Sequence, residues 1–202
     1  MYMEKREKKI AYKLFRVMST NKGKLFPLYV NADKPTPIGV WLDAECGELK
    51  PNGKVKSKLG DLAFRPGWHL SDYPLATHIG VKGDSGEIEF INAQHVWCEC
   101  EYSDEINYQE EANKNGTKED GKFIPRDAFL KKIPENGYYR YKTNPKMFGD
   151  WIISGKLKIN RILSDKEVNE ILTKNNLRIM PRQNGKFNTE KYGFEDIFKG
   201  DE

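Results

Sequence analysis

Alternating apolar and polar positions predict a series of β-strands along most of the chain. The clearest run covers residues 87–103, where apolar residues recur at every second position. In this run one face carries Val96, Cys98, Cys100 and Tyr102, and the other carries Trp97, Glu99 and Glu101. Similar runs predict further strands at 10–18, 23–31, 36–45, 135–143 and 150–163.

Two features modify this strand pattern. The runs 10–18 and 23–31 are joined by a short polar turn and are interpreted as a hairpin, in which Pro27 makes the second strand an edge strand or breaks it. The run 150–163 is long enough to bend at Ser154-Gly155. The sheet is therefore expected to be irregular.

Helix signals are fewer. Ser164 and Glu167 form a capping-box pattern ahead of apolar residues at helical spacing, which predicts a helix after residue 164. A second short helix is expected near Pro74, capped by Ser71 or Asp72. Strands and helices do not alternate regularly, so the pattern predicts an α+β fold with a twisted, mostly antiparallel sheet and two or three short helices.

The length of 202 residues favours one domain. We expect a charged N-terminal arm over 1–9, a single α+β domain over 10–180 and a C-terminal tail over 181–202, where aromatic residues are scattered without a period.

Charge and cysteine content exclude few classes of function. The net charge of +4 arises from 34 basic and 30 acidic residues, a small excess that does not identify a nucleic-acid-binding protein. Nucleic-acid binding through the basic runs 4–9 and 53–60 remains one alternative. No apolar run is long enough to cross a bilayer, and three cysteines fit a reducing compartment, so we expect a cytoplasmic protein with no membrane partner. The pattern does not determine the oligomeric state.

No metal site is predicted. Cys98 and Cys100 form one closely spaced pair, whereas zinc sites usually show two such pairs, and the pair is interpreted as core cysteines. Sequence signatures of nucleotide-binding loops and of serine hydrolases are absent.

The stretch 63–80, "AFRPGWHLSDYPLATHIG", concentrates the residue types that bind ligands. It holds an arginine, a tryptophan, two histidines and a serine-aspartate pair within 18 positions. A purely structural interpretation is equally open, in which Pro66-Gly67 shapes a turn, Trp68 is a core residue and Ser71 is an ordinary helix cap.

Within this stretch, "GWHLSDYPLAT" resembles a segment of the ADP-ribosyltransferase-like superfamily that forms one wall of the NAD pocket. The resemblance implies NAD as the bound substrate, with Gly67 and Trp68 in the wall, His69 packed on the nicotinamide ring and Ser71 bonded to the ribose. "YKLFRV" resembles the opening strand of that family and implies that Arg16 anchors the cofactor. Arg16 and His69 are then the candidate catalytic residues.

The chain departs from this family at its last core strand. That strand should carry a glutamate that stabilises the transition state, but 150–163 contains none. Asp150, Glu99 and Glu101 are the nearest substitutes.

A second resemblance covers most of residues 11–172, from "YKLFRV" through "HVWCECEY" to "WIISGKLKINRILSDKEV". This run is similar to a domain of bacteriophages and mobile elements that also occurs inside large polyvalent phage proteins. The resemblance implies action in the cytoplasm of a bacterial host during host takeover.

Together the two resemblances imply transfer of ADP-ribose from NAD to a host protein or nucleic acid. The alternative is a non-catalytic counter-defence protein that inhibits a host nuclease or captures a nucleotide.

Overall fold

The computed structural model describes residues 7–116, 118–119, 122–123, 127–196 and 198. Its main feature is one sheet of eight strands. Six of the seven neighbouring strand pairs are antiparallel, and the pair of β9 and β12 is parallel. In spatial order the strands are β2 (Trp41–Asp43), β14 (Lys156–Ile162), β8 (His95–Tyr102), β1 (Ile10–Arg16), β5 (Trp68–Ser71), β13 (Trp151–Ser154), β12 (Gly137–Tyr141) and β9 (Ile106–Asn107). The α+β class and the mostly antiparallel sheet are as the sequence predicts.

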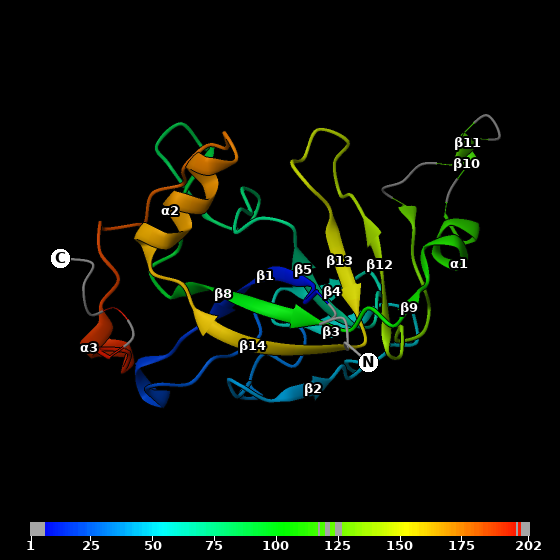
Figure 1. Cartoon of the computed structure of the whole chain (residues 1–202), viewed down its shortest axis with the longest axis horizontal. Helices are drawn as coiled ribbons and strands as arrows, with labels where there is room; N and C mark the ends of the chain where they lie inside the picture. The colour runs from blue at the N-terminus through cyan, green and yellow to red at the C-terminus, as the bar shows by residue number, and fades with distance from the viewer. Residues whose placement is uncertain (1–6, 117, 120–121, 124–126, 197, 199–202) are drawn as a thin grey trace, which may run out of the picture.

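The sheet consists of two parts that run in different directions. In Figure 1, β1, β8, β14 and β2 run across the view, while β12 and β13 stand nearly upright. The strands β1 and β8 pair along their whole length, from Ile10↔Glu101 to Arg16↔His95. β5 pairs with β13 over all four of its residues. The two parts meet between β1 and β5.

The bend expected at Ser154-Gly155 is confirmed and is sharper than the sequence suggests. It divides the run into β13 and β14, which take places on opposite sides of the pair β1 and β5 in the strand order. A Cβ at Gly155 would lie 2.2 Å from the carbonyl oxygen of Pro134. Only glycine allows the chain to turn from one part of the sheet to the other at this point.

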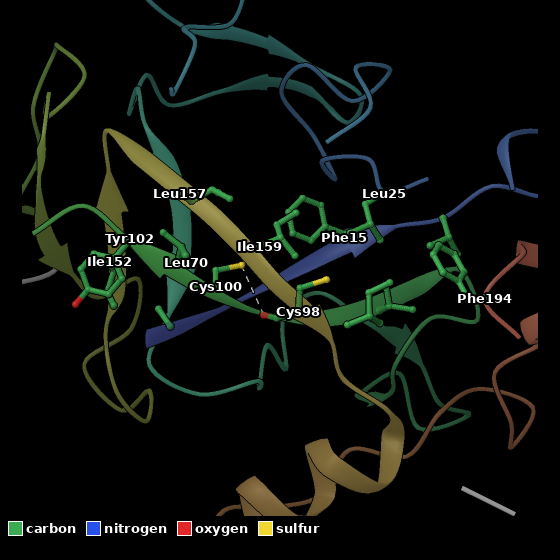
Figure 2. Close-up of a cluster of buried hydrophobic side chains, with 14 of the residues drawn as sticks. Phe15, Leu25, Leu70, Cys98, Cys100, Tyr102, Ile152, Leu157, Ile159 and Phe194 are labelled. Atoms are coloured by element: carbon green, nitrogen blue, oxygen red, sulfur yellow. Dashed lines mark hydrogen bonds between the residues drawn. The ribbon is translucent and has the colours of Figure 1, made fainter. Parts of the chain in front are cut away.

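Each face of the sheet is covered by an apolar cluster. Strands β1 and β8 contribute alternate residues to both, so Phe15 and Cys98 belong to one cluster, whereas Leu14 and Trp97 belong to the other. Figure 2 shows the first cluster, in which residues of β1, β8, β14, β5 and β13 pack together. The alternation predicted for 87–103 is confirmed for β8.

Three two-stranded hairpins and four short helical segments complete the part of the chain that the structure describes. The hairpins are β3 (Val55–Ser57) with β4 (Gly60–Leu62), β6 (Val81–Lys82) with β7 (Ile88–Phe90), and β10 (Lys118–Glu119) with β11 (Lys122–Phe123). The helical segments are the 3₁₀ turn η1 (Ser19–Asn21) and the α-helices α1 (Gln109–Lys114), α2 (Asp165–Lys174) and α3 (Thr189–Tyr192).

The helix predicted after residue 164 is confirmed as α2. Glu167 N donates 3.2 Å to the Ser164 hydroxyl, and Ser164 N donates 2.9 Å to the Glu167 carboxylate. Val168 and Leu172 are the buried residues of this helix and belong to the second cluster. The capping box fixes where α2 begins, and these two side chains hold it on the sheet.

Two expected elements are absent from the described residues. The run 23–31 forms only single bridges, Arg16↔Phe26 and Leu25↔Thr36, because Pro27 cannot donate to a ladder. The segment after Pro74 is a series of turns in which Ile79 N donates to the Ala76 carbonyl. The prediction of a helix there is wrong: the Ser71 hydroxyl donates to the Tyr73 carbonyl oxygen and the Asp72 carboxylate accepts from Arg140, so these contacts occupy both expected caps.

Each end of the chain is described only in part. Residues 1–6 of the expected N-terminal arm lie outside the described residues, as do 197 and 199–202 of the expected tail. The described part of the tail packs on the domain, because Tyr192 and Phe194 are buried in the first cluster. Among the described residues, no helix has the length and apolar character required to cross a membrane.

Candidate functional site

A cavity of about 740 Å³ opens where the two parts of the sheet meet. Its walls come from strands β1, β2, β5, β8 and β13, from the loop 27–37 and from the hairpin that carries β4. The stretch 63–80 contributes eight lining residues, which are Ala63, Arg65, Gly67, Trp68, His69, Ala76, His78 and Ile79. The arginine, the tryptophan and the two histidines that the sequence singles out by type are therefore brought to one place, whereas the serine-aspartate pair is not.

The cavity arises because β1 and β5 diverge. They pair at one position, Tyr12↔Ser71. At the next position the side chain of Lys13 takes the place of a backbone donor, and its Nζ donates a hydrogen bond of 2.9 Å to the carbonyl oxygen of His69. A side chain thus satisfies a strand carbonyl that the ladder leaves without a partner.

Lys13 occupies an apolar and aromatic environment. Its Nζ lies 5.8 Å from the ring centre of Trp68 and 5.5 Å from that of Phe15. In the described part of the chain no carboxylate is close enough to form an ion pair with Lys13. The ionisable groups near its amine are the thiols of Cys98 and Cys100. Burial lowers the pKa of the Lys13 amine to about 8.

The two thiols do not neutralise this amine. Burial raises the pKa of Cys100 to about 12 and that of Cys98 well above its usual value, so both remain protonated near neutral pH. Lys13 is therefore a cation that faces a cavity without an opposing negative charge.

His69 lies between two cationic side chains. Its backbone carbonyl accepts from Lys13, and its ring Nε2 lies 2.9 Å from the carbonyl oxygen of Arg65. Burial lowers the pKa of His69 to about 4, so the ring is neutral at physiological pH. The Arg65 guanidinium lies 4.2 Å from the ring centre of Tyr141, which also lines the cavity.

Aromatic residues form much of the wall. The Trp68 indole is held by its Nε1, which donates 3.0 Å to the Leu42 carbonyl oxygen. Trp97 and Trp151 are largely buried and line the cavity from β8 and β13. The His78 and Trp151 rings meet edge to face, with centres 5.4 Å apart. Such walls offer flat apolar surfaces to a ligand ring.

Gly67 shapes the entry to β5. Its φ of +138° disfavours any other residue, and a Cβ there would lie 2.4 Å from Ile153 Cγ2 and 3.2 Å from the Ser154 carbonyl oxygen. Glycine lets the start of β5 approach β13 closely, which directs Trp68 and His69 to the cavity.

Two of the residues proposed for the site lie elsewhere. Arg16 is not among the lining residues; its Nη2 donates 2.7 Å to the Ala32 carbonyl oxygen and lies 3.7 Å from the Asp33 carboxylate. It fastens the loop after Phe26 to the sheet. Ser71 is also not a lining residue, because its hydroxyl donates 2.7 Å to the Tyr73 carbonyl oxygen. The structure brings Gly67, Trp68 and His69 together at the cavity and places Arg16 away from it.

Asp72 has an anchoring role in the fold. Its carboxylate oxygens accept from Arg140 Nη1 at 2.8 and 2.9 Å, and one of them accepts from the backbone N–H of Asp150 at 2.8 Å. These contacts join the end of β5 to β12 and β13. The serine-aspartate pair of the stretch thus supports the site from outside the cavity.

The substitutes considered for a catalytic glutamate do not line the cavity. Asp150 lies 3.4 Å from Lys142 Nζ, Glu99 lies 3.2 Å from Arg161, and Glu101 is held by two lysines. The carboxylates that do line it are Asp43 and Glu45, which pair with Lys156 and Lys34 respectively. Within the described ranges, no three metal-ligating side chains come together.

Lys13 is the main site residue that the sequence interpretation omits. A signal for it exists, because Ala11, Phe15 and Val17 are buried on the same strand face and Lys13 is the one charged residue among these alternate positions. Tyr141 and Trp151 reach the cavity only through the pairing of β12 with β13 and of β13 with β5. No local sequence pattern predicts that these two residues line the cavity.

Comparison with known proteins gives no match to this chain among family models, curated proteins or solved structures.

Proposed function

We propose that the cavity binds a nucleotide, with a flat ring against the aromatic walls and a phosphate at the Lys13 amine. The observation that carries this proposal is the cation of Lys13, which faces a cavity and has no carboxylate partner in the described part of the chain. A bound anion would supply the missing negative charge and would stabilise the protonated amine.

The size and composition of the cavity support a ligand of this class. Its volume of about 740 Å³ suits a mononucleotide or a dinucleotide. Trp68 and Trp151 present rings on which a base or a nicotinamide can stack, and Tyr141 carries the Arg65 guanidinium on its ring. Arg65, next to His69, provides a second cation for a pyrophosphate.

NAD is the first nucleotide to test, because Gly67, Trp68 and His69 carry the resemblance to the ADP-ribosyltransferase-like superfamily and line the cavity. His69 is neutral, so it would contribute a ring surface and one polar nitrogen rather than a charge. Arg16 does not enter this proposal, since its guanidinium is bonded to Ala32 and lies near Asp33.

Nucleotide capture is the function that the geometry supports best. Transfer of ADP-ribose needs a carboxylate at the ribose, and the two lining carboxylates, Asp43 and Glu45, are already in ion pairs. Transfer to a host macromolecule remains the second candidate, favoured by the position of Gly67, Trp68 and His69 in the wall. The setting in a phage or mobile element, and in the cytoplasm of its host, rests on the sequence resemblance.

Calorimetric titration with NAD, ADP and adenosine tests the proposal. We expect saturable binding of NAD and ADP, and weaker binding of adenosine, which lacks phosphate. Absence of binding by all three would overturn nucleotide capture. Affinity for a host nuclease without affinity for nucleotides would favour the counter-defence alternative.

Release of nicotinamide separates capture from chemistry. If NAD binds and no nicotinamide is released with or without host lysate, the protein captures the nucleotide without cleaving it. Release that is lost in Glu45→Gln, in a protein that still binds NAD, would establish the transferase candidate and would identify its acid.

A further inference from the structure

The Lys13 amine combines three features that few surface lysines share. It lines a cavity large enough for an organic ligand, it makes one hydrogen bond, to the carbonyl oxygen of His69, and it lies against the Trp68 and Phe15 rings. In the described residues no carboxylate pairs with it. Such an environment gives the amine a larger neutral fraction than an exposed lysine has.

We propose that Lys13 is a nucleophilic amine that condenses with an aromatic aldehyde admitted to the cavity, forming an imine. This activity goes beyond nucleotide binding and would compete with it, because it requires the free Lys13 amine and not the ammonium form.

The geometry leaves the reacting atom available. A neutral amine that donates one N–H to the His69 carbonyl keeps a second N–H and its lone pair. The lone pair attacks the carbonyl carbon, and the carbon–oxygen double bond opens to give a carbinolamine. The nitrogen then forms a double bond to carbon as the oxygen leaves. Both amine hydrogens depart with that oxygen as water, so atoms and charge balance.

The aromatic side chains that line the cavity determine which class of aldehyde fits. Trp68 lies beside the amine, and the cavity is lined by further rings from Tyr141 and Trp151. A flat ring attached to the carbonyl carbon can stack on these surfaces while the carbonyl reaches Nζ. A ligand of this kind would be captured reversibly, because water hydrolyses the imine.

The groups facing Lys13 set its response to pH. On β8 they are the thiols of Cys98 and Cys100, which are protonated, and on the β5 side they are the neutral ring of His69 and the guanidinium of Arg65. The pKa of Lys13 is lowered to about 8 by its burial. Near neutral pH its unprotonated fraction exceeds that of an ordinary lysine by roughly two orders of magnitude.

Site-specific reductive labelling tests the proposal. The full-length protein is treated with benzaldehyde and cyanoborohydride near neutral pH, and benzylated lysines are mapped by peptide mass spectrometry over time. We expect Lys13 to be labelled at least about tenfold faster than Lys132, an exposed lysine that is paired with Glu111. The ratio of the Lys13 rate to the Lys132 rate should fall as the pH rises above 8, because the free-amine fraction of Lys13 then saturates while that of Lys132 still increases.

Two controls show whether the folded structure causes the fast labelling of Lys13. In denaturant the excess labelling of Lys13 should disappear. Lys13→Arg should remove the fast site while leaving the circular dichroism spectrum of the folded protein unchanged. Labelling of Lys13 no faster than that of Lys132 in the folded protein, or a ratio of the two rates that does not fall above pH 8, would overturn the proposal.

Discussion

The amine of Lys13 on β1 is bonded to the backbone carbonyl of His69 on β5, at 2.9 Å, next to the single position at which these two strands pair. This contact joins the two parts of the sheet and at the same time lies at the wall of the cavity. Lys13 therefore contributes both to the chemistry proposed for the cavity and to the contact between the two parts of the sheet.

The close approach of β5 to β13 depends on Gly67. We expect Gly67→Ala to lower the free energy of unfolding by about 3 kcal/mol, since it combines an unfavourable φ with a Cβ placed 2.4 Å from Ile153 Cγ2. Gly39→Ala is the matched control, because its φ is +84° and nothing lies within 4 Å of its Cβ, so it should cost about 1 kcal/mol. Urea unfolding of both variants measures the difference, and equal costs would contradict the close approach.

Acid should destabilise the protein through two half-buried histidines, His69 and His95. Burial lowers the pKa of His69 and of His95 to about 4, from an ordinary value of 6.5. The unfolded chain therefore binds protons at a higher pH than the folded chain, and stability that is fully present above pH 6.5 is lost as the pH falls toward 4.

Urea unfolding across this pH range, on the wild type and on the variants, measures the effect. His69→Gln and His95→Gln should each flatten the fall in stability. His78→Gln, at an exposed position, should flatten it less. A slope that does not change in His69→Gln would show that this ring is not held neutral by the fold.

The C-terminal segment is held by Arg182. Its side chain, 3% exposed, donates to both carboxylate oxygens of Asp165 at 2.8 and 2.9 Å and to the carbonyl oxygens of Asn92 and His95. We expect Arg182→Met to lower the free energy of unfolding by about 3 kcal/mol, because it removes all of the hydrogen bonds made by a buried guanidinium.

The control for this change is Arg178→Met, at an exposed position of the preceding segment, which should change stability by less than about 0.5 kcal/mol. Limited proteolysis gives a second readout, with earlier cleavage after residue 180 expected in Arg182→Met. Similar stability of both variants would mean that the segment docks without this arginine.

The sequence predicts those parts of the fold that local patterns determine. The alternation in β8 and the capping box of α2 depend on neighbours within a few residues, and both are found as expected. The break at Gly155 is signalled as a bend, but its consequence, that β13 and β14 lie on opposite sides of the pair β1 and β5, depends on which strands they meet. Such pairing is not encoded locally.

The same distinction explains the candidate site. Gly67, Trp68 and His69 are found at the cavity because they share one short stretch. The resemblance places Arg16 at the cavity through its strand, but Arg16 ends β1 and its guanidinium bonds the Ala32 carbonyl oxygen, whereas Tyr12 and Leu14 on the same strand face do line the cavity. Lys13, three residues earlier, is the cation of β1 that lines the cavity.

The central claim, that Lys13 holds a phosphate in the cavity, is tested most directly by calorimetric titration of Lys13→Met with ADP and with adenosine near neutral pH. Lys132→Met serves as the matched control, since Lys132 also lies over an aromatic ring, that of Tyr108, but is not a lining residue. We predict that Lys13→Met weakens the binding of ADP by about tenfold or more, leaves that of adenosine nearly unchanged, and that Lys132→Met alters neither. Binding of ADP by Lys13→Met with the affinity of the wild type would contradict the account.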